Sequence, residues 1–429
     1  MHIPLSAKAV VLPENTEEVS VAMKICHEHE QAVVVHGGLT NLVGATKTNI
    51  DELVISMEKL KRIEEVDEDS RTMTVQAGVI LEQIQQAAKE KDMLFPMNFG
   101  AKGSAQIGGI ISTNAGGLQV FRFGMTRNLV LGLEVVLANG TIVSSMKKII
   151  KDNSAYDVKQ LFIGSEGTLG IITKAVLKLE EAPSSRCSAF IGINEFQNVI
   201  GLLKFMDRET AGTLSSFELI WKNTYKAFTS PPAAAKPPLP HDYNFYVLLE
   251  ILGSDPEKDQ IKLESLLEQA LEKELILDAA IAYTQSDLNW FWTIREDVHV
   301  LKSQCNHDQH FDISLPIGNI GDYVADCYKK LYQIPEVELA FAFGHVADGN
   351  IHFIIGKSEQ TKRVIKQIND VIYQPLMSLG GSVSAEHGIG IHKKAYLSLC
   401  RTETEIQLMR SLKKSMDPKR ILNPGRVLD

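Results

Sequence analysis

The sequence GAKGSAQIGGIISTNAGG occupies residues 100–117, and it decides which kind of fold the chain can form. Together with Gly124 it places seven glycines within twenty-five residues. Ordering glycine costs more chain entropy than ordering any other residue, so such a stretch is favourable only where main chain must lie against a ligand. Apolar residues such as Ile107 and Ile110 are interleaved with the glycines, which favours a packed segment over a flexible loop. The stretch predicts backbone lying against a large, flat ligand.

Two further glycine clusters lie in the same part of the chain. GGLTNLVGA at 37–45 follows the apolar run 32–35, and FIGSEGTLGII occupies 162–172. Glycines after a strand let several N–H groups point to one place, which suits a phosphate. The spacing matches neither a Rossmann fingerprint nor a P-loop. A plain glycine-rich turn is the alternative for the first cluster alone, whereas three clusters favour an extended dinucleotide cofactor.

Length and composition exclude several classes of protein. The 429 residues indicate two or three domains, and the net charge of −9, with acidic and basic residues interspersed, argues against nucleic acid as a partner. The sequence contains no run of eighteen apolar residues, so we expect no transmembrane helix. The amino-terminal sequence does not resemble a secretory signal. None of the five cysteines forms a C-x-x-C pair, so we expect free thiols and a cytoplasmic location.

Hydrophobic periodicity predicts an α/β organisation with a break at residues 180–185. The predicted strands are Ala32–Val35, Leu53–Ile55, Met73–Ala77, Leu131–Leu137, Ile171–Leu177, Phe311–Leu315, Leu339–His345 and His352–Ile355. The predicted helices are Thr16–Glu30, with Thr16 as its cap, Asp255–Leu277 and Thr402–Met416. The proline-rich segment 228–242 is expected to be a surface loop.

The glycine clusters resemble the FAD-binding domain of the vanillyl-alcohol-oxidase type, in the branch that holds D-lactate dehydrogenases, the glycolate oxidase catalytic subunit and D-2-hydroxyglutarate dehydrogenase. The resemblance continues through LGLEVVLANG at 131–140, GHVADGNIH at 344–352, GGSVSAEHGIG at 380–390 and DPKRILNPGRV at 417–427. It implies an α+β fold: a two-subdomain FAD-binding domain at 1–182, then an α+β cap domain for the substrate at 183–385 with an antiparallel sheet. A C-terminal helical segment at 386–429 would close the active site.

The resemblance also implies which residues contact FAD. Those implied at the pyrophosphate are Gly37, Gly38, Thr40, Asn41 and Leu42. Those implied at the flavin are Pro96, Gly103, Ser104, Gly108, Gly109, Thr113, Asn114 and Gly117. Those implied at the adenine side and the ring are Glu166, Gly167, Gly170 and Ile172, with Asn423 returning from the C-terminal segment. Relatives that bind FAD covalently carry a histidine where this chain has Leu39, so we expect dissociable FAD.

A histidine pair is the second chemical signal. His345 and His352 flank Asp-Gly-Asn, a strong turn sequence, so their side chains can approach each other at a bend. Two imidazoles with a carboxylate suit Zn²⁺ or a similar divalent ion, and Glu386 is a candidate third ligand. From the spacing alone, two half-buried structural histidines are an equal alternative. The resemblance assigns His345, His352 and Glu386 to a divalent metal, which we expect to be zinc. It assigns His387 to removal of the substrate proton while hydride passes to the flavin.

The predicted substrate-binding residues are Arg295, His299 and His310. Arg295 matches the family's carboxylate-binding arginine, with a surface ion pair as its alternative reading. D-2-hydroxyglutarate enzymes have a threonine, a lysine and an asparagine where this chain has His299, His310 and Ile354. We therefore expect a D-2-hydroxy acid such as D-lactate or glycolate, with D-2-hydroxyglutarate as the alternative. His299, His307 and His310 could also form a proton-accepting wall or a polar lining.

Two other functions stay open at the level of sequence. One is a flavin-carrying electron-transfer subunit without its own substrate, and the other is a metal-dependent hydrolase on an unrelated fold. Neither a nicotinamide fingerprint nor an iron–sulfur ligand set appears in the sequence, so the expected electron acceptor is a quinone, an electron-transfer flavoprotein, a partner subunit or oxygen. A homodimer is compatible with the sequence.

Overall fold

The computed structural model of the chain describes residues 6–428. These residues form two compact units. The first unit contains the described residues up to 117, together with 123–182 and the segment from 386 onward, and the second contains 118–122 and 183–385. The second unit is therefore inserted into the sequence of the first. No helix within residues 6–428 is long and apolar enough to cross a membrane.

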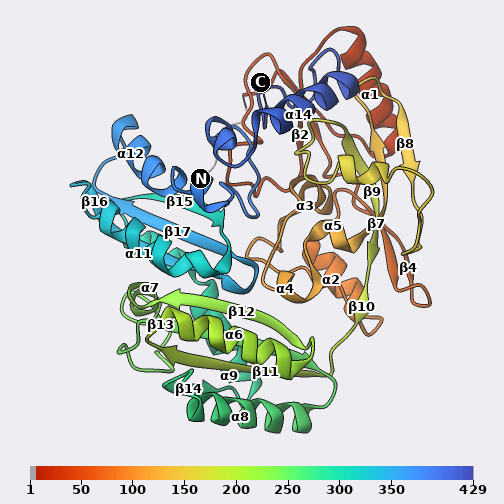
Figure 1. Ribbon diagram of the computed structural model, residues 1–429. Helices are drawn as coiled ribbons and strands as arrows, with labels where there is room; N and C mark the ends of the chain where they lie inside the picture. Colours follow the sequence, from red (N-terminus) through yellow and green to blue (C-terminus); the bar gives the residue numbers. More distant parts are fainter. Residues whose placement is uncertain (1–5, 429) are drawn as a thin grey trace. The chain divides into compact units, whose positions relative to one another are not determined.

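Three short parallel strands open the first unit. They are β1 (Ala9–Val11), β2 (Val33–His36) and β3 (Leu53–Ser56), with β3 in the middle. Helix α1 (Thr16–Glu28) connects β1 to β2 and buries Val19, Met23 and Cys26, the three residues with helical spacing (Figure 1). The first glycine cluster begins directly after β2, at the carboxyl end of a parallel strand.

The cap of α1 corrects one expectation. Asn15, and not Thr16, is the N-cap residue: its backbone is extended and its Oδ1 accepts the N–H of Glu18 at 2.9 Å. Asn15 thereby satisfies one of the N–H groups that every helix leaves unpaired at its start. Thr16 is already helical, and its hydroxyl donates to Glu134 at 2.5 Å.

A five-stranded antiparallel sheet forms the rest of the first unit, in the order β4-β5-β9-β7-β8 (Figure 1). Its strands are β4 (Ile63–Asp67), β5 (Thr72–Gln76), β7 (Val130–Val136), β8 (Ile142–Ser145) and β9 (Ile171–Lys178). The accompanying elements are α2 (Leu81–Lys89), α3 (Ile107–Thr113), α5 (Thr126–Leu129) and the antiparallel pair β6 (Met93–Leu94) and β10 (Glu180–Glu181). Helix α4 (Val120–Phe123) lies mostly in the short segment 118–122 that belongs to the second unit. Ile107 and Ile111 of α3 are buried in the same core as Leu133 and Ala175, so the second glycine cluster is a packed segment.

A seven-stranded antiparallel sheet forms the second unit, in the order β14-β11-β13-β12-β16-β17-β15 (Figure 1). The strands are β11 (Ser185–Ile193), β12 (Leu214–Trp221), β13 (Phe245–Gly253), β14 (Asp278–Ile281), β15 (His307–Ser314), β16 (Val337–His345) and β17 (Asn350–Lys357). The helices are α6 (Phe196–Thr210), α7 (Lys222–Phe228), α8 (Pro256–Glu272), α9 (Gln285–Glu296), α10 (Val298–Ser303), α11 (Ile320–Leu331), α12 (Lys362–Tyr373) and α13 (Leu376–Leu379).

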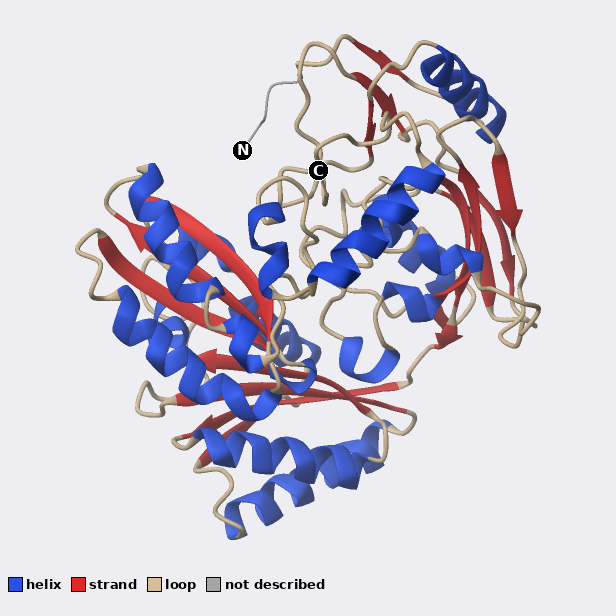
Figure 2. Ribbon diagram, turned by 45° about the horizontal axis from the view of Figure 1, so that its top comes forward, coloured by secondary structure: helices blue, strands red, loops and turns tan. Residues whose placement is uncertain are grey.

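One face of this seven-stranded sheet packs against α7, α9 and α10. Aromatic residues of these helices, including Phe228 and Phe291, share a core with Phe343 of β16 and Ile354 of β17. Side chains alternate between the two faces of a strand, so His352, two residues before Ile354, points to this same face. Helices lie on both sides of the strands in the second unit (Figure 2).

The C-terminal segment returns to the first unit. Helix α14 (Glu403–Met416) begins at Thr402, whose hydroxyl accepts the N–H of Glu405, and is followed by the fully buried Asp417. The carboxylate of Asp417 accepts the N–H groups of Ile421 and Leu422 at 3.1 and 2.8 Å. Leu422 in turn forms a parallel bridge with Val33 of β2, so this segment extends the small parallel sheet.

Candidate active site

The histidine pair lies where β16 and β17 join. His345 ends β16, a short helical turn covers Val346–Asp348, and Gly349 has a φ of 84° before β17 begins. A left-handed residue is needed to reverse the chain here, and glycine adopts it without steric strain. The turn chemistry of Asp-Gly-Asn therefore does what the sequence predicted: it brings His345 and His352 together.

The two rings are placed as a pair of metal ligands would be. Their Nε2 atoms are 3.4 Å apart, and the rings are perpendicular with centroids 5.3 Å apart. Two nitrogens bound to one tetrahedral zinc at about 2.0–2.1 Å lie roughly 3.3 Å from each other. His345 is buried and His352 is half-buried. The donor set therefore fits a small divalent cation.

Glu218 is a site residue that sequence reasoning missed. It lies on β12 directly opposite His345 of β16, its side chain is fully buried, and its Oε1 accepts a hydrogen bond from His345 Nδ1 at 2.6 Å. With Nδ1 donating, the neutral ring of His345 keeps the lone pair of Nε2 for a metal. Burial raises the pKa of Glu218, but its interactions with His345 and Arg295 outweigh the effect of burial and hold the pKa below its usual value.

Arg295 of α9 is the other partner of Glu218. Both Nε and Nη2 of Arg295 lie 2.8 Å from Oε2 of that carboxylate, and the guanidinium sits 4.8 Å from the ring centre of Phe343. The ion pair is buried rather than at the surface, which corrects the alternative reading of this arginine. No partner is recorded for Nη1 among the described residues, and this atom can therefore take a carboxylate oxygen from a substrate.

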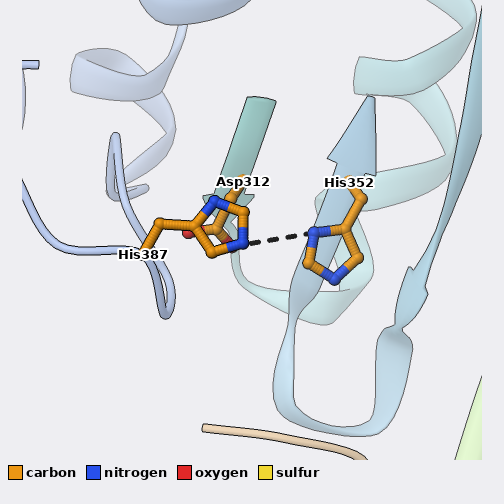
Figure 3. A group of neighbouring side chains, drawn as sticks. All are labelled: Asp312, His352 and His387. Carbon is orange, nitrogen blue, oxygen red and sulfur yellow. Dashed lines mark ion pairs between the residues drawn. The ribbon is translucent and has the colours of Figure 1, made fainter. Parts of the chain in front are cut away.

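Asp312 ties the sheet to the segment that carries His387. Its buried carboxylate accepts the side-chain amide of Asn350 at 2.8 Å and the N–H of Ala385 at 3.2 Å. Glu386 and His387 follow Ala385 directly in the chain. Two overlapping sets of side chains offer the donor atoms that a metal ion takes, His345–His352–Glu386 and Asp312–His352–His387. Figure 3 labels Asp312, His352 and His387, and its dashed line marks the ion pair of 3.9 Å between Asp312 and His352.

The loop after His387 is held by a second buried carboxylate. Glu166 has both oxygens engaged, accepting the N–H of Ile389 at 2.7 Å and of Gly390 at 2.8 Å. Burial raises the pKa of Glu166, and those two hydrogen bonds and the charge of Lys393 oppose the rise. The sequence assigned Glu166 to the cofactor. In the structure its side chain holds the backbone that follows His387.

The first two glycine clusters lie side by side. A Cβ on Gly38 would stand 2.0 Å from the carbonyl oxygen of Ser104, so only glycine permits this approach. Gly109 is exposed and a Cβ there would meet no atom within 4 Å. Two side-chain oxygens nearby, Asn98 Oδ1 and Gln106 Oε1, are buried without a hydrogen-bond partner among the described residues. Such orphaned acceptors and open glycine backbone fit a bound ligand with N–H or O–H donors.

The loop of the first cluster presents apolar side chains to solvent. Leu39 and Leu42 are 61% and 56% exposed, and Leu39 has a φ of 57°, which is unusual for a side chain of its size. Asn41 is turned inward: its Oδ1 accepts the N–H of Ala45 and its amide donates to the hydroxyl of Thr46. Thr40 is exposed. These features fit a loop that is completed by a bound cofactor.

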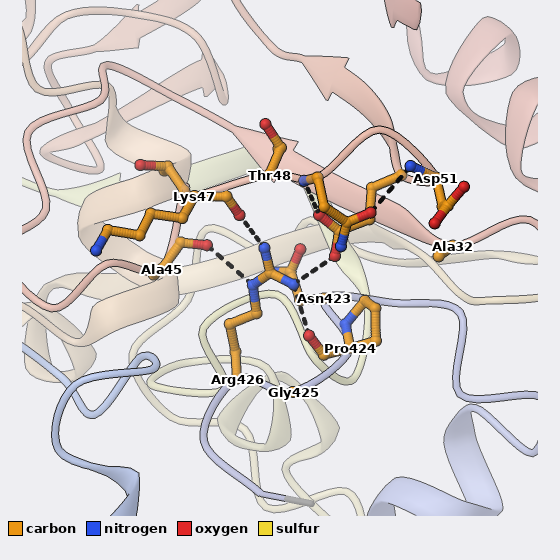
Figure 4. A network of polar contacts seen from close by, with 12 residues as sticks. Ala32, Ala45, Lys47, Thr48, Asp51, Asn423, Pro424, Gly425 and Arg426 are labelled. Atoms are coloured by element: carbon orange, nitrogen blue, oxygen red, sulfur yellow. Dashed lines mark hydrogen bonds and ion pairs between the residues drawn. The ribbon is translucent and has the colours of Figure 1, made fainter. Parts of the chain in front are cut away.

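Asn423 and Arg426 from the C-terminal segment fix these loops. Asn423 accepts the N–H of Val35 at 2.9 Å and donates to the carbonyl of Glu166 at 2.6 Å, so it links two glycine clusters. Arg426 donates to the carbonyls of Ala45 and Lys47 and pairs with Glu52, as Figure 4 shows in part. The sequence predicted Asn423 at this site, whereas nothing in the sequence singled out Arg426.

The other residues assigned to FAD divide into two groups. Those with backbone or side chains exposed or half-exposed are Gly37, Gly103, Ser104, Thr113 and Asn114. Those buried by neighbouring protein atoms are Pro96, Gly108, Gly117, Gly167, Gly170 and Ile172. Ile172 belongs to the core of the five-stranded sheet, and a Cβ on Gly170 would stand 2.6 Å from Val135. The side chain of Ile172 and the Cα of Gly170 therefore serve packing, whatever their backbone contacts.

The three histidines of the predicted substrate wall lie on α10 and β15 of the second unit. His299 on α10 and His307 on β15 are exposed. His310 is half-buried and its Nε2 meets the carboxylate of Asp308 at 2.5 Å. Burial and the charge of Lys302 lower the pKa of His310, although Asp308 opposes them.

Comparisons with known proteins show the family and the fold of the chain. The family described as "FAD linked oxidases, C-terminal domain" matches residues 182–427, and the family described as "FAD binding domain" matches residues 7–145. Among solved structures, alkyldihydroxyacetonephosphate synthase has a TM-score of 0.76 at 18% identity, covering 97% of this chain and 76% of that one. p-Cresol methylhydroxylase with substrate bound has a TM-score of 0.75 at 15% identity, covering 98% and 88%. These likenesses confirm the predicted fold.

Three curated relatives cover nearly the whole chain. Mitochondrial D-2-hydroxyglutarate dehydrogenase of Arabidopsis thaliana is 37% identical over 99% of this chain and 75% of its own length. A Schizosaccharomyces pombe protein provisionally named a mitochondrial D-lactate dehydrogenase is 37% identical, covering 97% and 81%. D-2-hydroxyglutarate–pyruvate transhydrogenase of Saccharomyces cerevisiae is 36% identical, covering 98% and 86%. The chain therefore belongs to the FAD-linked oxidases and is an FAD-dependent oxidoreductase.

Proposed function

We propose that this protein oxidises a D-2-hydroxy acid to the 2-oxo acid, with dissociable FAD and a divalent cation. The set of donor atoms favours zinc as that cation. The observation that carries the proposal is the cluster of His345, His352, Glu218 and Arg295: two imidazole ligands stand beside a guanidinium that still has a donor to offer. The names of the relatives, which act on 2-hydroxy acids, support the same substrate class.

Two bound groups complete the site. FAD would lie against the glycine clusters, where Gly109 is open and Asn98 and Gln106 offer unpaired acceptors, and it supplies a hydride acceptor. A divalent cation would be held by His345, His352 and Glu386, and it supplies positive charge that lowers the pKa of a hydroxyl.

The chain's own residues would then perform three tasks. Nη1 of Arg295 binds the substrate carboxylate and thereby fixes the orientation of C2. A ring nitrogen of His387 takes the proton of the C2 hydroxyl, a task for which the unperturbed pKa of histidine is suited. Glu166 keeps the His387 loop in place through its hydrogen bonds to Ile389 and Gly390.

We infer that a substrate with one carboxylate is preferred over a dicarboxylate. His310 lies two residues before Asp312 on β15, so their side chains share the sheet face to which His352 also belongs. His310 is paired with the carboxylate of Asp308, and burial disfavours its charged form. The carboxylate of Asp308 would repel a second carboxylate of a long substrate there, and the charge of Lys302 would oppose that repulsion. The relatives named for D-2-hydroxyglutarate support the alternative substrate.

The test is anaerobic mixing of the FAD-loaded protein with D-lactate, glycolate, D-2-hydroxyglutarate and the L isomers, while the flavin absorbance at about 450 nm is followed. Bleaching by a D monocarboxylate and not by its L isomer is expected. Bleaching by none of these acids would refute the proposal. A preference for D-2-hydroxyglutarate would refute the role given to His310 and Asp308 and leave the reaction class standing.

A further inference from the structure

Glu218 has no role in the proposed reaction so far, yet it contacts both a proposed metal ligand, His345, and the proposed substrate-binding residue, Arg295. Its side chain is 1% exposed, Oε1 bonds Nδ1 of His345, and Oε2 takes two hydrogen bonds from Arg295. These three residues come from β12, β16 and α9. One carboxylate is thus shared between a proposed metal ligand and the proposed substrate-binding arginine.

Burying a carboxylate in this position is unfavourable unless it is fully paired. Removing an ionised group from water costs several kcal/mol, and only close opposite charges and hydrogen bonds offset that cost. A structural role could be filled by an apolar residue of the same size, with no charge to compensate. The retained carboxylate, with each oxygen directed at a different functional side chain, indicates that its contacts matter for the site.

We propose that Glu218 is a positioning residue that sets the metal-binding tautomer of His345 and the orientation of Arg295 together. Through Oε1 it keeps the proton of His345 on Nδ1, which leaves the Nε2 lone pair for the cation. Through Oε2 it occupies Nε and Nη2 of Arg295, which leaves Nη1 as the donor for the substrate carboxylate. The inference rests on the proposed function, because both partners take their roles from it.

The same sheet offers a matched control. Glu250 on β13 is also buried, and its carboxylate binds Arg186 and the indole N–H of Trp292, three residues before Arg295 on α9. Glu250 therefore joins two other strands of the sheet, β13 and β11, to the same helix through a buried charge. It has no recorded contact with His345 or Arg295. Replacing it removes a comparable structural interaction without touching the proposed site.

The experiment measures binding of Zn²⁺ alone. FAD-loaded wild-type protein, Glu218→Gln, Glu250→Gln and His345→Ala are stripped with a chelator, and Zn²⁺ affinity is measured by competition with a chromophoric chelator. Glu218→Gln keeps the shape and loses the charge, so we expect Zn²⁺ affinity to fall by about 10- to 100-fold. Glu250→Gln is expected to bind like the wild type, and His345→Ala is expected to lose the site.

The outcomes separate this inference from the proposed function. Wild-type affinity in Glu218→Gln, with loss of Zn²⁺ in His345→Ala, would overturn the role of Glu218 and leave the metal site standing. Equal loss in Glu218→Gln and Glu250→Gln would show general destabilisation and would also overturn it. Equal Zn²⁺ binding by wild type and His345→Ala would overturn the metal site and this inference with it.

A second measurement addresses Arg295. In steady-state assays with the best substrate of the panel, we expect Glu218→Gln to raise KM more than it lowers kcat, because a misoriented guanidinium weakens carboxylate binding. Glu218→Asp keeps the charge on a shorter side chain and serves if the Gln variant does not fold. It is expected to lie between wild type and His345→Ala in Zn²⁺ affinity. Wild-type KM and wild-type Zn²⁺ affinity in Glu218→Asp and Glu218→Gln alike would refute the positioning role.

Discussion

Arg426 and Glu52 form a buried ion pair of 2.7 Å across 374 positions of sequence, with both side chains no more than 5% exposed. Arg426 also donates to the carbonyls of Ala45 and Lys47, in the loop that follows the first glycine cluster. One side chain of the C-terminal segment therefore neutralises a buried acid and holds the loop proposed to bind the pyrophosphate.

Replacing Arg426 by alanine would leave the carboxylate of Glu52 buried without its partner. Removing one member of a buried pair destabilises by about 3–5 kcal/mol. We expect a lower thermal unfolding midpoint and loss of FAD during gel filtration, measured by the ratio of flavin to protein absorbance. Arg401→Ala is the control, since its pair with Glu405 is half exposed and such pairs contribute about 0–1 kcal/mol. Equal behaviour of the two variants would contradict the role of Arg426.

Glu166→Gln tests how the His387 loop is held. A carboxamide has one acceptor oxygen, so its NH₂ group would face one of the N–H groups of Ile389 and Gly390. Hydrogen bonds to a charged group contribute about 1.5–3 kcal/mol, and we expect flavin reduction by substrate to slow by roughly 10- to 100-fold while FAD stays bound. Stopped-flow measurement against Glu181→Gln, an exposed acid, checks this. Unchanged reduction would show that the loop does not depend on Glu166.

The histidine pair illustrates what the sequence can predict. The turn residues between His345 and His352, and the strand pattern on either side, predict a hairpin that joins the two rings, because all the determining residues are local. Glu218 is different. It lies 127 positions before His345, and the pairing of β12 with β16 depends on the order of strands in the whole sheet, which no local pattern encodes.

Distant contacts also explain the corrected cap of α1 and the ion pair of Arg295. Thr16 and Asn15 are both good cap residues, and the choice between them depends on Glu134, which engages the hydroxyl of Thr16. The sequence predicts that Arg295 binds a substrate carboxylate, with a surface ion pair as the alternative. The structure makes it a buried pair with Glu218, because packing of α9 on the sheet brings them together. In both cases the deciding partner comes from another element.

His387→Ala removes the proposed proton acceptor. General bases contribute about 10²–10⁴-fold to rate, so substrate should bleach the flavin at least a hundredfold more slowly while the protein stays yellow. His29→Ala, an exposed histidine at the end of α1, is the control. Retained bleaching would reject His387 as the base.

Removal of the metal should also slow the loss of the hydroxyl proton, because the cation lowers the pKa of that hydroxyl. Treatment with EDTA is expected to remove about one metal ion per chain, measured by mass spectrometry, and to abolish turnover until Zn²⁺ is restored. His352→Ala should contain no metal from the start, because it lacks one of the two paired Nε2 atoms. Full turnover after complete metal removal would exclude the cation from the reaction.

Acid precipitation tests how FAD is attached. Leu39 stands where covalent relatives have a histidine, and its side chain offers no nucleophile, so all yellow colour should remain in the supernatant. Colour in the washed pellet would contradict dissociable FAD. The absorbance of both fractions decides the outcome.

The path of the chain also sets an order of events during synthesis. Val33 of β2 can form its bridge only after Leu422 has been synthesised, and the N–H of Val35 can bind the side chain of Asn423 only after that residue has been synthesised. The whole inserted unit, residues 183–385, leaves the ribosome before either partner exists. A nascent chain can thus finish its seven-stranded sheet early, whereas the FAD-binding unit is completed only after Leu422 and Asn423 have been translated. Premature termination anywhere after the insert would leave a folded second unit attached to an open first one.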